Sequence, residues 1–119
     1  MKESLVEPLE ALVESGSISA AGFCDLDGED VALHPPTHRD AIRNLAAVGG
    51  VALRRLNMAE RLAGRSPLRS VTIDGTRRSV MSWLVSDEYQ LVLLVNEDAL
   101  PAQVKGLVEA TVRELAEKI

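Results

Sequence analysis

The sequence predicts an α/β (α+β) fold in which one five-stranded antiparallel sheet carries helices on both faces. The hydrophobic period changes along the chain in the order helix, hairpin, helix, three-strand meander, helix. The pairs Asp27-Gly28 and Asp74-Gly75 each separate two apolar runs, which is typical of a tight antiparallel hairpin. Residues 89–95 (YQLVLLV) are apolar almost throughout, as expected of a central strand that is covered on both faces.

The first helix is expected near the start of the chain, where apolar residues recur at helical spacing. Ser4 can cap this helix, but Pro8 has no backbone N–H to donate, so the helix starts irregularly or only near Pro8. Residues 17–26 and 29–33 then form the first hairpin. The pair Pro35-Pro36 ends its second strand, because proline cannot donate to a sheet.

Residues 39–64 form the longest uninterrupted helix-like run in the chain. Thr37 followed by Asp40 resembles a capping box at its start, and Gly64 closes it. One broad apolar face is expected to meet the core. A second, flanking face carries the apolar residues Ala47, Val51, Met58 and Leu62. A helix that is apolar on two sides packs against its own sheet and also against something else.

The pair Gly49-Gly50 lies near the middle of this helix-like run, and each glycine costs about 1 kcal/mol relative to alanine in a helix interior. With Ala46, Ala47 and Ala52 nearby, the pair leaves a flat patch of backbone. Two interpretations are open. The patch is either a weak spot or a break between two shorter helices, or it is a contact site for a second protein chain.

Three strands and a helix are expected after residue 64. The strands are residues 68–74, 78–85 and 89–95. Trp83, the only tryptophan, is expected in the core or at an interface. Asn96 or Asp98 can cap the last helix, with Pro101 in its first turn.

The chain has 119 residues, which is enough for one domain, residues 1–119, and too few for two. Aromatic residues make up only 3% and the net charge is −5, and both values disfavour a general nucleic-acid binder. A single cysteine excludes an internal disulfide. No long apolar run and no signal-peptide pattern is present, so we expect no membrane span and a cytoplasmic location.

Charge is unevenly distributed along the chain. Residues 39–65 contain six arginines against Asp40 and Glu60, so this segment carries +4 and the remainder of the chain carries −9. A basic helix on an acidic protein fits an acidic partner surface. A solvated helix face explains the pattern equally well.

No catalytic, cofactor-binding or metal-binding site is predicted. Cys24 lies on an expected buried strand, which favours a structural thiol over a nucleophile. His34 and His38 flank the two prolines, but zinc needs further ligands at suitable spacing. Asp25 and Asp27 lack the remaining ligands of a calcium loop. No glycine-rich loop with a lysine follows a strand, so a P-loop is excluded.

Four stretches carry a resemblance that covers nearly the whole chain. They are Leu9-Glu10-Ala11-Leu12 leading to Gly16, Gly22-Phe23-Cys24-Asp25-Leu26-Asp27-Gly28, Ala46-Ala47-Val48-Gly49-Gly50, and Leu91-Val92-Leu93-Leu94-Val95. In this order they resemble the roadblock / dynein light chain family. The run Ala-Ala-Val-Gly-Gly most resembles bacterial motility and polarity regulators of the MglB type, in which the matching helix faces a small GTPase.

The resemblance implies a roadblock-like (profilin-like) fold of order α-β-β-α-β-β-β-α, with the second helix on one face of the sheet and two helices on the other. It also implies that two chains join through residues 39–64 and 68–74 into one continuous sheet. The dimer contact is expected at Val48, Val51, Ala52, Arg55, Val71 and Ile73. A partner is expected on the small-residue edge of the helix, at Arg43, Ala46, Ala47, Gly50, Arg54 and Asn57.

The first hypothesis for function is a homodimer that binds and regulates a small Ras-like GTPase in motility or cell polarity, with a paralogous roadblock protein as the alternative second subunit. Simple docking ranks above donation of an arginine finger by Arg43, Arg54 or Arg61. The second hypothesis is a structural adaptor without effect on GTP hydrolysis. The third is a small-molecule sensor, which needs a polar-lined cavity that aliphatic strands offer poorly.

Overall fold

The computed structural model describes residues 2–119, with side chains from Ser4 onward. Its elements follow the predicted order α-β-β-α-β-β-β-α. They are α1 (Lys2–Glu14), β1 (Ile18–Asp25), β2 (Asp30–His34), the 3-10 turn η1 (Pro36–His38), α2 (Arg39–Leu62), β3 (Ser70–Asp74), β4 (Arg78–Leu84), β5 (Tyr89–Asn96) and α3 (Pro101–Glu117). Each predicted strand is present, with ends that differ from the prediction by at most two residues.

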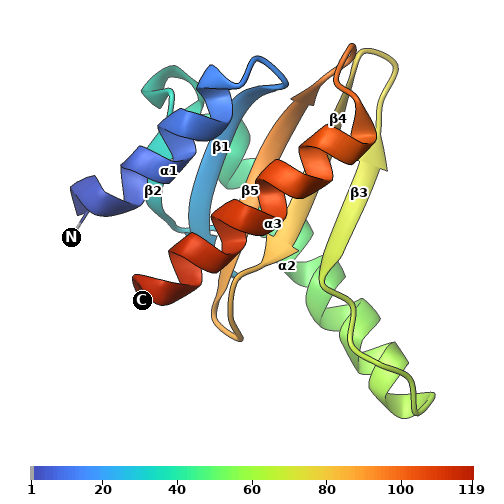
Figure 1. Ribbon diagram of the computed structural model, residues 1–119. Helices are drawn as coiled ribbons and strands as arrows, with labels where there is room; N and C mark the ends of the chain where they lie inside the picture. Colours follow the sequence, from blue (N-terminus) through green and yellow to red (C-terminus); the bar gives the residue numbers. More distant parts are fainter. Residues whose placement is uncertain (1) are drawn as a thin grey trace.

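The five strands form one antiparallel sheet in the order β2-β1-β5-β4-β3. The apolar strand β5 lies in the middle, as its composition predicts, and residues 91–95 are all buried. Figure 1 shows α1 and α3 on one face of the sheet and α2 on the other. The one-and-two division of helices that the resemblance implies is therefore confirmed.

Two apolar layers hold the helices to the sheet. The larger layer joins α1 and α3 to the sheet and includes Leu9, Phe23, Leu91 and Val108, all at most 1% exposed. The smaller layer joins α2 to the sheet through Ile42, Ala46, Cys24, Val92 and other small or aliphatic residues. Because strand side chains alternate between faces, neighbouring residues of β5 contribute to different layers.

The first helix departs from its predicted start, because α1 runs from Lys2 through Pro8 without a break. Pro8 cannot donate a backbone hydrogen bond to Ser4 O, four residues earlier. At that carbonyl the Lys118 Nζ group, from the other end of the chain, donates a hydrogen bond of 2.7 Å. The helix α1 thus begins before Pro8, and Ser4 O accepts a hydrogen bond from Lys118 where Pro8 has no N–H to donate.

The predicted helix caps are wrong at two places. Thr37 lies in the 3-10 turn and contacts His38, and no side chain caps the start of α2. Neither Asn96 nor Asp98 caps α3, which begins after Leu100, and Asn96 Nδ2 instead donates to Gly16 O at 2.9 Å. Gly64, by contrast, follows the end of α2 with a positive φ of 71°, as predicted.

Candidate functional site

The outer face of α2 carries a continuous stripe of exposed apolar side chains. Its members are Val48, Val51, Met58 and Leu62, with exposed fractions of 59, 47, 62 and 84%, and Arg55 lies among them. Their spacing alternates between three and four residues, which places them on one side of a helix. Large apolar side chains gathered on one exposed face make this surface a candidate for contact with another molecule.

The C-terminal part of α2 extends beyond the sheet (Figure 1). The buried residues of α2 are Ile42, Ala46, Gly49, Gly50 and Leu53, so residues 54–62 contain none. Asn57 Oδ1 accepts a hydrogen bond from Leu68 N, which secures the chain as it returns toward β3. One hydrogen bond thus connects the exposed part of α2 to the segment before β3.

Strand β3 forms one edge of the sheet. Its residues Val71 and Ile73 lie on the face of the sheet that α2 covers. Val71 lies opposite Ser82 and Ile73 opposite Val80, and both partners face α2. Ile73 is 51% exposed and Val71 is half-buried. An edge strand with apolar side chains and an unpaired backbone is a template for pairing with another chain.

The residues predicted for a dimer contact lie on α2 and on the edge strand β3. Val48, Val51 and Arg55 are exposed on α2, and Ala52 is half-buried beside them. Arg55 forms no ion pair with another described residue, so its charge is available to a partner. Met58 and Leu62 were missing from the predicted contact, although their spacing from Val51 and Arg55 indicates the same face.

The pair Gly49-Gly50 is neither a break between two helices nor an exposed contact surface. The helix α2 continues through both residues, and both are buried against the chain's own sheet. A Cβ atom at Gly50 would lie 2.0 Å from Leu26 O, and one at Gly49 would lie 2.0 Å from Ser82 Oγ. The glycines allow α2 to approach its own strands closely, and no partner can reach Gly50.

Three further residues of the predicted partner site already have a structural role. Ala46 is fully buried, so its assignment to a partner surface is wrong. Ala47 lies under Gly28, where a Cβ atom would come within 3.0 Å of the alanine methyl. Asn57 is half-buried and holds Leu68 N. Arg43 and Arg54 are left as the accessible part of the predicted site.

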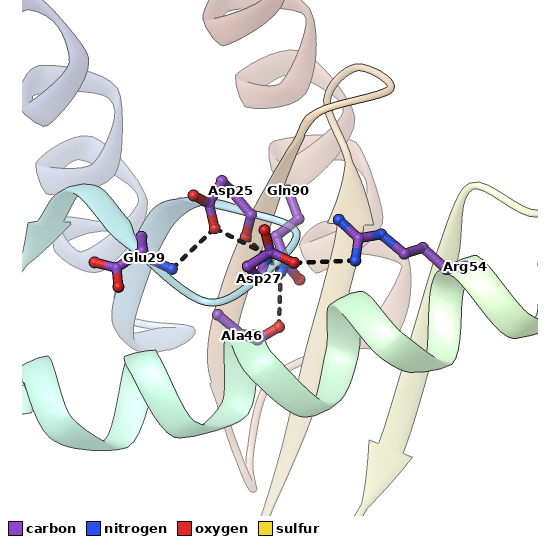
Figure 2. Close-up of polar contacts among 6 residues, drawn as sticks. All are labelled: Asp25, Asp27, Glu29, Ala46, Arg54 and Gln90. Carbon is purple, nitrogen blue, oxygen red and sulfur yellow. Dashed lines mark hydrogen bonds and ion pairs between the residues drawn. The ribbon is translucent and has the colours of Figure 1, made fainter.

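Arg43 and Arg54 both contact the turn that joins β1 to β2. Arg54 Nη1 lies 3.0 Å from Asp27 Oδ1. Figure 2 shows the two side chains pointing toward one another. Arg43 lies 3.6 Å from a carboxylate oxygen of Glu29 and 3.5 Å from one of Asp30. These carboxylates offset part of the positive charge of α2, so the surface beside the turn carries both signs of charge.

The turn itself is held by its first aspartate. Asp25 Oδ1 accepts hydrogen bonds of 2.9 Å from the backbone N–H groups of both Asp27 and Glu29. Gly28 adopts a φ of 99°, which a side chain would disfavour. The predicted hairpin is confirmed, and Asp27, predicted as a turn residue, also points its carboxylate at Arg54 (Figure 2).

Gln90 connects this turn to α2, a role that the sequence analysis does not predict. Its Nε2 group donates to Asp25 O at 3.0 Å and to Ala46 O at 2.7 Å (Figure 2). Gln90 is fully buried, and an amide in such a place needs hydrogen-bond partners. The signal was available, because Gln90 is the one amide in the apolar run YQLVLLV.

Cys24 is buried on β1 beneath α2. Burial raises the pKa of its thiol from 9.0 to about 12, the carboxylates of Asp30 and Asp25 add to this effect, and Arg43 opposes it. The thiol is therefore protonated at neutral pH, which fits a structural residue.

Neither a metal-ligand cluster nor a membrane-spanning helix is found in the described part of the chain. Among residues 2–119, no three His, Cys, Asp or Glu side chains gather as metal ligands do. None of the described helices has the length and apolar character needed to cross a membrane.

No family model and no curated protein matches the sequence. The fold is similar to that of Myxococcus xanthus MglB, with a TM-score of 0.86, 14% identity, and coverage of 98% of this chain and 87% of that one. A gliding protein MglB from Thermus thermophilus gives a TM-score of 0.80 and 22% identity over 97% and 87% of the two chains. A roadblock/LC7 domain from Streptomyces avermitilis gives 0.83 and 16% over 95% of each.

Profilins share the same general fold at lower scores. The superposition with MglB and with the roadblock/LC7 domain covers at least 95% of this chain, so it includes the five-stranded sheet and the helices on both of its faces. At these identities the similarity concerns the fold, and the chain has the roadblock/LC7 fold, in a form that matches MglB over nearly its whole length.

Proposed function

We propose that this chain is a single roadblock-like domain, residues 1–119, which forms a homodimer and binds and regulates a small Ras-like GTPase. The observation that carries the proposal is the exposed apolar stripe of α2. It lies on the face of α2 turned away from its own sheet, so burial in the monomer does not account for it. The fold shared with MglB supports a GTPase partner over other protein partners.

The proposed dimer contact comprises the exposed stripe of α2 and the outer edge of β3. Burial of Val48, Val51, Met58 and Leu62 against a second copy removes four of the five large exposed hydrophobic side chains of α2 from water, the fifth being Leu56. Pairing of β3 with the β3 of a second copy satisfies its open backbone groups. A two-fold axis lets one patch serve both subunits, as in most homodimers.

The proposed GTPase contact is the flank of α2 that carries Arg43 and Arg54, together with the turn between β1 and β2. With 3.6 residues per turn, these two arginines lie on a different side of the helix from the apolar stripe. Both are already paired with carboxylates, which supports docking by charge complementarity over an arginine finger. The proposal includes no catalytic residue of this chain.

The test uses the small Ras-like GTPases encoded in the same genome, beginning with any whose gene neighbours this one. Each GTPase is purified, loaded with GDP or with a non-hydrolysable GTP analogue, and titrated with the chain. The rate of GTP hydrolysis is then measured with and without it. We expect one GTPase to bind in a nucleotide-dependent way and its hydrolysis rate to change.

Arg54→Gln is expected to weaken this binding about tenfold, because it removes one charged contact. The matched control is Arg77→Gln, an exposed arginine on the turn between β3 and β4. Binding without any change in hydrolysis would support the adaptor hypothesis instead. If no GTPase binds, the proposed function is wrong.

A further inference from the structure

The side chain of Gln90 occupies a space that two glycines of α2 leave open. A Cβ atom at Gly50 would lie 3.1 Å from Gln90 Nε2, and one at Gly49 would lie 3.2 Å from Gln90 Oε1. Either atom would crowd the amide group. The pair Gly49-Gly50 therefore lets a sheet residue place its amide directly against α2, at a depth where Gln90 is fully buried.

The amide of Gln90 joins two elements that both carry charges of the proposed GTPase contact. Gln90 Nε2 donates to Asp25 O at 3.0 Å and to Ala46 O, on α2, at 2.7 Å (Figure 2). The turn that follows Asp25 carries the carboxylate of Asp27, and α2 carries Arg54, which pairs with it at 3.0 Å. One buried side chain thus holds the backbone of both halves of this charged surface.

Neither carbonyl oxygen depends on Gln90 alone for a hydrogen bond. Asp25 O also accepts from Gly28 N at 3.2 Å. Ala46 O lies inside the continuous helix α2, where the N–H group four residues later normally donates to it. Gln90 Oε1, in contrast, is buried without a hydrogen-bond partner in the described chain, which has a cost in stability. An apolar side chain of similar size would avoid that cost, so the needs of the two carbonyls do not account for the amide.

We propose that Gln90 is a positioning residue, which sets the place of the turn between β1 and β2 against α2 and thereby the spacing of the charges that a GTPase meets. The part that concerns a GTPase rests on the proposed function, whereas the coupling between the turn and α2 belongs to the chain alone. Asp25 extends the effect along the turn, because its Oδ1 atom accepts from the N–H groups of Asp27 and Glu29 at 2.9 Å. Loss of the Gln90 bridge therefore loosens the turn without unfolding the protein.

The first measurement uses the unaltered, ¹⁵N-labelled chain. Hydrogen exchange of the side-chain amide of Gln90 is followed by NMR and compared with that of Gln103, the one other glutamine, which is exposed on α3. We expect exchange at Gln90 to be at least about 100-fold slower, because its amide is buried and donates to two carbonyl oxygens. Exchange as fast as at Gln103 would overturn the proposed bridge.

The second measurement uses Gln90→Met, which keeps the length of the side chain and removes the donor. Backbone exchange at Asp27 and Glu29 should accelerate about tenfold, while exchange within β5 and the urea midpoint of unfolding stay close to wild type. Val108→Ala, a core change on the opposite face of the sheet, is the control. It should lower the urea midpoint without a selective effect on the turn. The proposal is overturned if the turn is unaffected in Gln90→Met, if β5 is affected equally, or if that variant does not fold.

The third measurement is binding of the GTPase identified by the test of the proposed function. Gln90→Met should weaken binding about tenfold, although a buried Gln90 cannot touch the partner. In an Arg54→Gln background the further loss should be smaller, because both changes act on the same contact. Equal losses in the two backgrounds would contradict a positioning role. If no GTPase binds any form of the chain, the proposed function fails, and the exchange measurements by themselves decide whether Gln90 couples the turn to α2.

Discussion

Gly50 is a residue at which α2 lies directly against the backbone of the turn that follows β1. A Cβ atom there would lie 2.0 Å from Leu26 O and 2.8 Å from the carbon of the same carbonyl, and both are backbone atoms that cannot move aside alone. Gly49, one residue earlier, faces the side chain of Ser82. The helical cost of two glycines is therefore offset by close packing of α2 on its own sheet.

Gly50→Ala is expected to lower the free energy of unfolding by about 1–3 kcal/mol, because overpacking outweighs the better helix propensity of alanine. Gly106→Ala on α3 is the matched control, since a Cβ atom there meets nothing within 4 Å. It should stabilise the protein by roughly 0.5–1 kcal/mol. Urea unfolding followed by circular dichroism measures both. A Gly50→Ala protein as stable as the wild type would contradict the buried position of Gly50.

At the scale of elements, the two ends of the chain stabilise one another. The helix α1 contains Pro8, which has no backbone N–H to donate to Ser4 O. Lys118, just after α3, donates to that carbonyl oxygen instead. The same ammonium group lies 3.2 Å from Glu114, which holds it in place. A contact between residues 114 positions apart in sequence therefore helps to position a helix that local propensity disfavours.

Lys118→Met is expected to cost about 1 kcal/mol of stability, because the aliphatic stem is kept while a charge-assisted hydrogen bond is lost. Lys105→Met is the control, since Lys105 is exposed and its only ion pair in the described chain, with Glu109, is 3.9 Å long. That change should cost less than about 0.5 kcal/mol. Thermal unfolding compares the two variants. Equal effects would show that the contact with Ser4 contributes nothing.

At the scale of the whole molecule, the two faces of the sheet are covered to different extents. Two helices cover one face, whereas a single helix covers the other and extends past its edge (Figure 1). The exposed apolar stripe of α2 and the open edge of β3 both lie on the less covered side. A second copy of the chain would complete that side, which is why the proposed function begins with a homodimer.

Val51→Lys is expected to convert the proposed dimer into a folded monomer, because it places a charge in the middle of the apolar stripe. Leu107→Lys is the matched control, since Leu107 is an exposed leucine of α3 on the other face. Light scattering at micromolar concentration should give twice 12.8 kDa for the wild type and the control, and 12.8 kDa for Val51→Lys. A wild-type mass of 12.8 kDa with native circular dichroism would rule out the homodimer.

The sequence predicts which residues of the candidate site share a helix face, but not which of them are buried and which are exposed. The spacing of Val48, Val51 and Arg55 places them on one helix face, and β3 is recognisably amphipathic. The same spacing places Gly50 and Ala46 beside Arg43 and Arg54, and the prediction took all four as accessible. Arg43 and Arg54 are exposed, whereas Ala46 and Gly50 are buried. Small residues fit both a partner contact and close packing within a chain.

The sequence by itself determined the order of the elements, the hairpins and the central place of β5, since each depends on periodicity and turn chemistry between near neighbours. Only the tertiary structure decided how α2 is rotated against the sheet, and so that Ala46 and Gly50 are buried. A helix fixes the angles between its side chains but not its rotation about its own axis against another layer. That rotation is set by contacts with residues far away in sequence, such as Leu26 and Gln90 against Gly50 and Ala46.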